Sequence, residues 1–328
     1  MVFDFTPDPG FNFLNAFAGR IGSQIEGDVL NLTPVIGEGA IRRIRFSADF
    51  SLLIHHYTLK ESLILRRSAA KKTDDKINFL FQINDVSRPE ISDLRINPVT
   101  PNEYAIRITS TNIASEIVLP ANMEIYFTVL NVSREGLKTL LNISKPNVTI
   151  ETILTGDSGF LFYENMSNEM QMALKALTLI ENQIDLARLK TWIKVQQLIC
   201  LLFERLLERD NIKHRPIQQV DAQSLIQIKN HILFDLSSPP ELPKLAALAG
   251  MSISKLTDLF RQIFGDSIYN YYQKARMEKA AYLLSFKEHS VAETGYQLGY
   301  TNLSHFSRVF EKHFGIKPKR YSSAKNEN

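Results

Sequence analysis

Short apolar stretches that partly alternate with polar residues dominate the first half of the chain. Between residues 25 and 132, six such stretches are rich in Ile, Val, Phe and Tyr, and turn-prone residues separate them. They read AIRRIRF, FSLLIHHYTL, SLILRR, INFLFQIN, YAIRITS and MEIYFTVLNV. Many short strands joined by turns are typical of a sandwich or barrel, so the pattern predicts a mostly-β domain. A Phe-rich segment from Phe11 to Phe17 predicts a short helix that covers one end of this domain.

From Ser167 onward the apolar spacing becomes helical. One stretch, DLARLKTWIKVQQLICLLFERLLER, has apolar residues at intervals of three to five: Leu186, Leu189, Ile193, Leu198, Leu202, Phe203 and Leu206. Helices appended to a β-domain can pack back on that domain or on a second copy of the chain, and the pattern leaves both open. The following RDNIKHRPIQ is polar and contains Pro216, which is typical of a linker.

The C-terminal third contains one unit twice. In the first copy, ELPKLAALAGMSISKLTDLFRQIFG, Leu242, Leu245, Ala246 and Ala249 share one helix face. Gly250 can adopt the left-handed conformation that ends a helix, and Ser252 is a good N-cap for the next helix. That helix repeats the spacing with Leu256, Leu259, Phe260 and Ile263. Two short helices joined by a tight turn predict a helix-turn-helix unit.

The second copy is SVAETGYQLGYTNLSHFSRVFEKHFG, residues 290–315. Here Gly299 takes the turn position and Asn302 the N-cap position, and the inner face comprises Phe306, Val309, Phe310 and Phe314. Residues 267–285 predict one helix that connects the copies. The chain therefore divides into a β-rich sensor or regulatory domain, a helical dimerisation segment, a linker and a DNA-binding domain, at residues 1–165, 166–210, 211–220 and 221–328.

Charge supports a polyanionic partner for the last of these. The chain has a net charge of +3, yet residues 211–328 hold 16 Lys and Arg against 10 Asp and Glu, while residues 1–210 hold 22 against 25. A helical bundle without a ligand is the plainer interpretation, but the duplication and the local charge favour DNA. The absence of a long apolar run, the single Cys200 and the acidic N-terminus without a signal-peptide pattern predict a cytoplasmic protein that has no membrane contact.

Three stretches carry a family resemblance: LAGMSISKLTDLFRQIFG, ARMEKAAYLL and GYQLGYTNLSHFSRVFEKHFGIKPKRY. They resemble the AraC/XylS transcription regulators across the C-terminal third, and the general layout extends the resemblance loosely to the whole chain. The family usually has an aliphatic residue and an alanine where this chain has Thr294 and Gly295. The resemblance implies a cupin-like N-terminal domain and a multidomain fold with two helix-turn-helix units at the C-terminus.

The resemblance also implies DNA contacts, since each second helix would enter a major groove, the two grooves lying ~34 Å apart. The outward residues of the first recognition helix are Ser254, Lys255, Thr257, Asp258 and Arg261, and those of the second are Leu303, Ser304, His305, Ser307, Arg308 and Lys312. Arg308 is suited to a guanine, Asp258 to a cytosine amine and Leu303 to a thymine methyl group. For Lys255, Lys312 and Lys319, phosphate contact is the expected role. Arg276 and Glu278 are expected to hold the scaffold.

The N-terminal domain offers no clear chemistry. His55 and His56 are adjacent strand residues that face opposite ways, so they cannot both bind one metal, and we expect no metal and no cofactor. Arg66, Arg67 and Arg107 could bind an acidic ligand, although solvated strand faces explain them as well. Cys200, inside LICLLF, is expected to be a buried packing residue.

These observations favour a sequence-specific transcription regulator over an enzyme. The resemblance implies an activator that binds double-stranded promoter DNA near RNA polymerase, forms a homodimer and responds to a signal on its N-terminal domain. One alternative is the same DNA reader controlled by a protein partner without a small-molecule effector. A cupin-type enzyme tethered to DNA is the third hypothesis, and it lacks a metal cluster or a nucleophile–base pair.

Overall fold

The chain forms two compact units, residues 1–219 and 220–328. The computed structural model describes residues 1–70, 75–83, 104–156, 159–180, 185–209, 214–215, 217–285 and 289–326.

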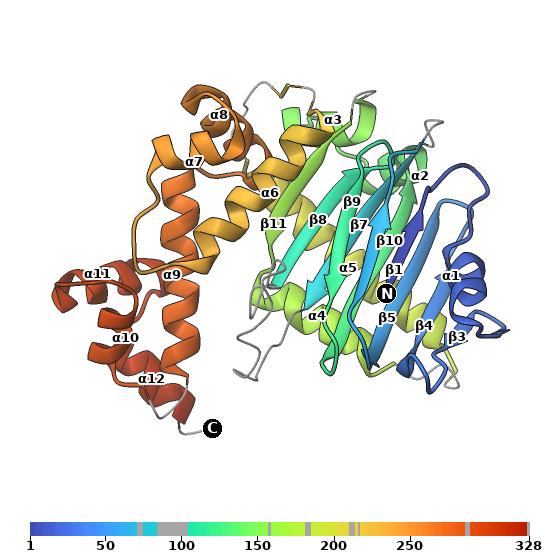
Figure 1. The fold of residues 1–328 in the computed structure, drawn as a ribbon, viewed down its shortest axis with the longest axis horizontal. Coiled ribbons are helices and arrows are strands. Elements are labelled where there is room, and N and C mark those ends of the chain that lie inside the picture. The colour runs from blue at the N-terminus through green and yellow to red at the C-terminus, as the bar shows by residue number, and fades with distance from the viewer. Residues whose placement is uncertain are drawn as a thin grey trace. The chain divides into compact units, whose positions relative to one another are not determined.

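The strands of the first unit form two sheets (Figure 1). In the described ranges, the larger sheet has the strand order β11-β8-β7-β10-β5-β4-β3-β2 and the smaller one the order β1-β6-β9. The long central strands pair antiparallel, whereas β1 and β6 run parallel. The strands are β1 (Val2–Phe5), β2 (Ile25–Glu26), β3 (Val29–Asn31), β4 (Gly37–Arg45), β5 (Phe50–Leu59), β6 (Leu63–Arg67), β7 (Lys76–Ile83), β8 (Tyr104–Ser110), β9 (Ser115–Leu119), β10 (Glu124–Ser133) and β11 (Leu161–Asn165). The predicted mostly-β domain is confirmed.

The two faces of the larger sheet bury different cores, because successive side chains of a strand point to opposite faces. On β5, Leu52 and Ile54 belong to one core, while Leu53 and Tyr57 belong to the other. Helices cover the first core, whereas the second core is shared with the smaller sheet and with α1 (Phe13–Ile21), the Phe-rich helix expected from the sequence.

Helices α4 (Asn168–Thr178) and α5 (Ala187–Leu207) pack on the larger sheet, and α2 (Arg134–Leu141) and α3 (Val148–Thr155) complete this layer. The buried stripe of α5 includes Val195, Leu198 and Leu202. The helix pair is also fixed by polar bonds, since Arg42 donates to the carbonyl of Ile180 and Tyr126 to that of Leu174. One stripe of α5 therefore packs back on the β-domain, which was one of the two sequence-based alternatives. Leu189 and Ile193 on another side of α5 remain exposed, at 51% and 53%, as does Leu186 directly before the helix, at 66%.

Two sequence-based expectations for single side chains have opposite outcomes. His55 is buried against Phe127, and burial lowers the pKa of its imidazole to about 3, while His56 is exposed and bonds Glu124. The two histidines therefore face opposite ways, as predicted. Cys200 was expected to be buried, and this was wrong, because its side chain lies on the exposed side of α5 beside Glu204.

The end of α5 is held by side chains from two other elements. The Asn147 amide caps α3 through its oxygen and donates to the carbonyls of Leu206, Leu207 and Arg209 through its nitrogen. The Arg209 guanidinium is paired with Glu164 of β11 at 2.6 Å. Further along, the His214 ring lies within hydrogen-bond distance of Thr149 and Thr152 of α3 and beside Phe162. Within the predicted linker, His214 is thus attached to the first unit.

The regular elements of the second unit, within its described residues, are all helices. It contains α6 (Gln219–Phe234), α7 (Leu242–Ala249), α8 (Ile253–Phe264), α9 (Ile268–Leu284), α10 (Val291–Gln297), α11 (Leu303–Phe314) and α12 (Pro318–Asn326). In neither unit is any described helix both long and apolar enough to cross a membrane. The described residues also contain no cluster of three or more His, Cys, Asp or Glu suited to a metal.

Candidate nucleic-acid interface

Helices α7 and α8 form the first helix-turn-helix unit. α7 ends at Gly250, whose φ of 64° is the left-handed conformation that glycine adopts without strain. Ser252 then caps α8 by accepting a hydrogen bond from the Lys255 backbone N–H. The buried side of α8 comprises Leu256, Leu259, Phe260, Gln262, Ile263 and Phe264. Sequence and structure agree on where the turn lies and on which face of α8 is buried.

Helices α10 and α11 form the second helix-turn-helix unit, and their N-caps make more hydrogen bonds than the N-cap of α8. Ser290 and Glu293 make a reciprocal capping box at the start of α10, and the hydrogen bonds from Ser290 lower the pKa of the Glu293 carboxyl. Asn302 caps α11 by accepting from the backbone N–H groups of both Ser304 and His305. Phe306 and Phe310 are fully buried beneath α11, as the sequence predicted.

The turn of the second helix-turn-helix unit packs against the chain between α6 and α7. Gly299 has a φ of 76°, and a Cβ atom there would lie 1.8 Å from the carbonyl oxygen of Ser237. The neighbouring carbonyl of Leu236 accepts a hydrogen bond from Tyr272 of α9. The chain between α6 and α7 therefore crosses the turn between α10 and α11, and only glycine fits at that position.

The connecting helix α9 holds the two helix-turn-helix units together. Its Arg276 is buried, lies over the rings of Tyr272 and Tyr300 at 5.0 and 3.9 Å, and donates to the carbonyl of Leu298. A cation between two aromatic rings gains quadrupole attraction on both sides. Glu278 on the same helix lies 3.3 Å from the His313 ring of α11. Both residues thus make scaffold contacts.

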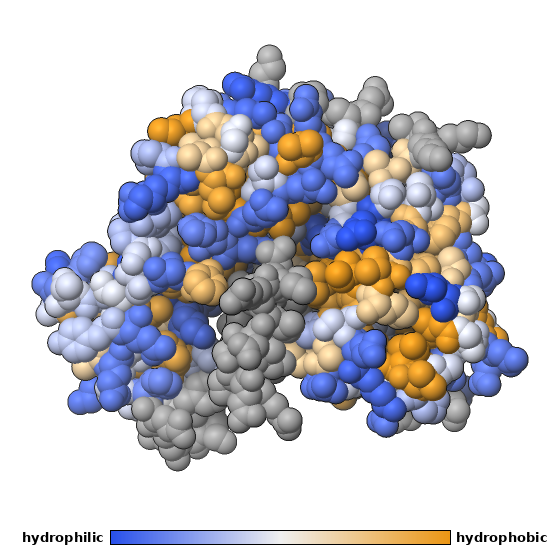
Figure 2. Space-filling model, viewed as in Figure 1, coloured by the Kyte–Doolittle hydropathy of each residue, from blue (hydrophilic) through white to orange (hydrophobic). Residues whose placement is uncertain are grey.

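Most of the predicted DNA-contacting side chains lie on the solvent side of α8 and α11. The exposed residues are Ser254, Asp258, Arg261, Ser304, His305, Arg308 and Lys312, and the partly buried ones are Lys255, Thr257, Leu303 and Ser307. The view in Figure 2 shows a mostly hydrophilic surface over α10 and α11. The exposed set is rich in hydrogen-bonding groups, which is what reading base edges requires.

Lys255 has a partner that the sequence pattern did not reveal. Its ammonium lies 2.8 Å from the Asp221 carboxylate of α6, and Asp221 is buried. The two residues are far apart in sequence, so no local pattern could have signalled this pair. Leu303 likewise packs inward, since it lies close enough to Gly295 that a Cβ there would be 2.6 Å from its Cδ2.

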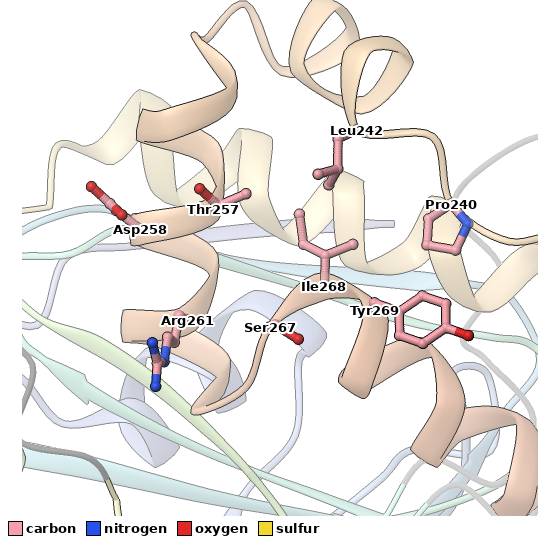
Figure 3. Close-up of a pocket in the computed structure, with 8 residues that line it drawn as sticks. All are labelled: Pro240, Leu242, Thr257, Asp258, Arg261, Ser267, Ile268 and Tyr269. Atoms are coloured by element: carbon pink, nitrogen blue, oxygen red, sulfur yellow. The ribbon is translucent and has the colours of Figure 1, made fainter.

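A pocket of about 410 Å³ adjoins the outer face of α8 (Figure 3). Thr257, Asp258 and Arg261 line it from α8, and Ser267, Ile268 and Tyr269 line it from the start of α9. Pro240 and Leu242 close it at the start of α7. Because Asp258 and Arg261 belong to both surfaces, this pocket is part of the candidate interface.

Comparison with known proteins identifies the helical unit. Residues 245–324 match a family described as a helix-turn-helix domain. An uncharacterized HTH-type transcriptional regulator of Haemophilus influenzae is 32% identical over 80 residues, which cover 24% of this chain and 27% of that protein. The arabinose operon regulatory protein of Escherichia coli is 28% identical over 130 residues, which cover 39% of this chain and 42% of that protein.

Among solved structures, a probable AraC family transcriptional regulator from Rhodopseudomonas palustris is similar at 26% identity and a TM-score of 0.29, covering 31% of this chain and 97% of that one. The matched region spans less than half the length of both curated relatives. The two capped helix pairs on a shared scaffold helix, which lie almost wholly within residues 245–324, make this part of the chain a helix-turn-helix domain similar to that of the arabinose operon regulatory protein.

Proposed function

We propose that the protein is a sequence-specific DNA-binding transcription regulator, and that α8 and α11 are its recognition helices. The observation that carries this proposal is the pair of helix-turn-helix units on α9, each with a buried apolar face and an exposed polar face. Docked side by side on a duplex, such helices enter successive major grooves ~34 Å apart.

Individual side chains have different roles in this proposal. Arg308 is exposed on α11, and its Nε donates to the Ser304 carbonyl, so the rest of the guanidinium remains available to a guanine. Asp258 on α8 is suited to a cytosine amine. Lys312, one turn beyond Arg308, is suited to a phosphate. Ser254, Arg261, Ser304 and His305 complete the exposed set.

Separating base reading from phosphate contact tests the proposal. Arg308→Ala should cost ~1–3 kcal/mol on the preferred site and flatten the preference at one base position. Lys312→Ala should weaken binding to all sequences about equally and lower the salt slope by ~1. The measurement is a randomised-site binding selection followed by a salt titration with both variants.

The outcome of that selection has three informative forms. No preferred sequence for the unaltered protein would contradict the proposal as a whole. Retention of full base preference by Arg308→Ala, with its loss in Lys312→Ala, would mean that α11 is rotated in the groove relative to our assignment. Equal, sequence-independent losses for both would assign Arg308 to a phosphate.

The direction of regulation and its control belong to the same proposal. The resemblance to AraC/XylS regulators favours activation, with RNA polymerase as the neighbouring partner at the promoter. We assign the β-rich unit, residues 1–219, the role of receiving the signal. Control by a protein partner is the alternative, and it predicts an unchanged DNA affinity when small metabolites are removed from the purified protein.

We further propose a homodimer that uses the exposed stripe of α5. Leu189 and Ile193 are more than half exposed on a helix whose opposite face is already packed on the sheet, and Leu186, directly before the first residue of this helix, is exposed as well. Ile193→Glu should shift sedimentation toward the monomer, while Val35→Glu, at an apolar residue that is 80% exposed in a loop, should not. A monomer at micromolar concentration before any substitution would rule out this dimer.

A further inference from the structure

Asp221 of α6 is an acidic residue at an apolar position of its helix. It lies on the buried side of α6 in line with Leu225, Ile228 and Ile232, at spacings of four, three and four residues. Those three side chains are at most 3% exposed, and Asp221 itself is 9% exposed. The positive end of a helix favours an acid in the first turn, but it does not require burial. Burial of a carboxylate costs free energy that an apolar side chain avoids, so the stability of α6 alone does not explain Asp221.

The Asp221 carboxylate is paired with a side chain of the first recognition helix. Its Oδ1 accepts a hydrogen bond from Lys255 Nζ of α8 at 2.8 Å, and no other described residue forms a hydrogen bond or ion pair with this carboxylate. The side chain of Lys255 is 42% exposed, whereas that of Asp221 is 12% exposed. An ammonium has three N–H donors, so two remain for an acceptor outside the protein. The pair therefore has one buried half and one half that meets solvent.

The exposed half of the pair lies at the N-terminal end of α8. Lys255 is the third residue of this helix, and its backbone N–H donates to the capping side chain of Ser252. Side chains of a helix tilt toward its N-terminus, so the ammonium lies beside the first turn. In helix-turn-helix proteins the first residues of the recognition helix contact the base edges. The proposed function thus puts this ammonium at the part of α8 that reads DNA.

A structural tie between α6 and α8 explains the pair only in part. An ion pair with a partly exposed partner contributes little to stability, and two apolar side chains would hold the helices together at least as well. Phosphate contact, the role that the sequence favours for Lys255, also fits poorly, because Asp221 offsets the positive charge on which attraction to phosphate depends. What remains is two N–H donors held in one place, which suits the O6 and N7 acceptors of guanine.

Lys312 of α11 has the contrasting arrangement. It is exposed, lies in the last turn of its helix and forms no ion pair with any residue that the structure describes. Its charge is therefore not offset and its long side chain is not held, which suits a phosphate. The two recognition helices thus carry one lysine whose charge is balanced and one whose charge is not.

We propose that Asp221 is a positioning residue for DNA reading, which holds the Lys255 ammonium so that it donates to a guanine and not to a phosphate. The inference rests on the proposed function, because that proposal places α8 in a major groove. It adds α6 to the elements that select a DNA sequence, although Asp221 lies outside residues 245–324 and outside both helix-turn-helix units.

A randomised-site binding selection with a salt titration tests the role of Asp221 in the full-length protein. Asp221→Asn keeps an oxygen beside Lys255 but removes the charge that holds the ammonium. The preference for one base pair should fall by roughly fivefold or more, and the released ammonium should raise the salt slope by ~1. Glu241→Gln is the matched control, because it removes one carboxylate from an exposed pair with Lys244 in the same unit. It should leave the preference at every base pair unchanged.

A double variant separates base reading from phosphate contact. Asp221→Leu combined with Lys255→Met replaces the pair by two apolar side chains and leaves the net charge unaltered. Leucine continues the apolar stripe of α6, so the fold should be retained. The preference at the same base pair should fall by about 5- to 150-fold, while the salt slope should not change. Thermal unfolding checks the fold of each variant, and the double variant decides the matter if Asp221→Asn does not fold.

Two results would overturn the inference. An unchanged preference at every base pair in Asp221→Asn, or in the double variant, would reduce the pair to a tie between α6 and α8. A salt slope lowered by ~1 in the double variant, with the base preference retained, would assign Lys255 to a phosphate.

Arg308→Ala, measured in the same selection, separates this inference from the proposed function. If the unaltered protein selects a sequence in which one position depends on Arg308 and none depends on Asp221, the role of Asp221 is wrong and the regulator stands. If the unaltered protein selects no sequence, the regulator is wrong and the role of Asp221 is lost with it.

Discussion

The two helix-turn-helix units share one sequence pattern but differ in what surrounds their turns. At Gly250 of the first unit, a Cβ atom would meet nothing within 4 Å, so only the left-handed backbone requires glycine. At Gly299 of the second unit, the carbonyl of Ser237 occupies the place of a Cβ. The comparison shows that a turn glycine can serve backbone conformation alone or, in addition, the close approach of a distant segment.

The recognition helices differ in a corresponding way. At the start of α8, Lys255 is paired with Asp221 of α6, so the first unit is tied to α6 through a side chain near its outer face. The second unit is tied through its turn, which leaves the outer face of α11 fully polar and exposed at Ser304, His305 and Arg308. The second unit should therefore be the less tolerant of changes in its turn and the more adaptable in its DNA-facing residues.

The largest difference is expected at the two glycines. Gly250→Ala should destabilise the first unit by about 1–2 kcal/mol, the cost of a left-handed alanine. Gly299→Ala adds a backbone clash to that strain and should cost about 2–5 kcal/mol. Hydrogen exchange of the backbone amides in α8 and α11 of the full-length protein measures both effects. Equal loss of protection from the two substitutions would contradict the comparison.

A smaller difference is expected at the N-caps. Asn302 accepts two backbone N–H bonds and Ser252 accepts one, so removal of Asn302 leaves more donors unsatisfied. Asn302→Ala should cost about 1–2 kcal/mol and Ser252→Ala about 0.5–1 kcal/mol. Urea unfolding gives the two values, with Asn302→Ser and Ser252→Thr as controls that retain a capping oxygen. A larger loss at Ser252 would show that local capping does not control these helices.

The smallest effect is expected at Gly295, where the related family usually has alanine. Alanine gains up to ~1 kcal/mol of helix propensity over glycine. The new Cβ would lie 2.6 Å from Leu303 Cδ2, the end of a flexible side chain that can rotate away. Gly295→Ala should therefore change stability by less than ~1 kcal/mol while moving Leu303 on the DNA side. Binding selection should then show a changed preference only at the base beside Leu303.

Local features of this fold were predictable from the sequence. The turn at Gly250, the caps at Ser252 and Asn302 and the buried face of α11 depend on residues within one or two helical turns of each other, so spacing alone locates them. The alternation of β5 likewise placed His55 and His56 on opposite faces. The exposure of α8 and α11 follows from the same periodicity once the buried face is known.

Features that depend on distant segments were not predictable. The Lys255–Asp221 pair and the contact of Ser237 with Gly299 join residues that no periodic pattern relates. Cys200 lies in an apolar run, yet the helix turns it toward solvent while Leu198 and Leu202 face the sheet. Arg66 and Arg67 look equivalent in sequence, and only the pairing of β6 shows which one is buried.

The attachment of His214 to α3 determines how much of the linker can act as a tether. A chain released at the end of α5 would span up to about 40 Å before α6 begins at Gln219, whereas a chain held at His214 spans at most about 18 Å. The effective concentration of a tethered domain depends steeply on such a length. The contacts of His214 with Thr149 and Thr152 therefore shorten the length of chain that is free between the two units, and a change in α3 that releases His214 should lengthen it without altering a residue of the linker.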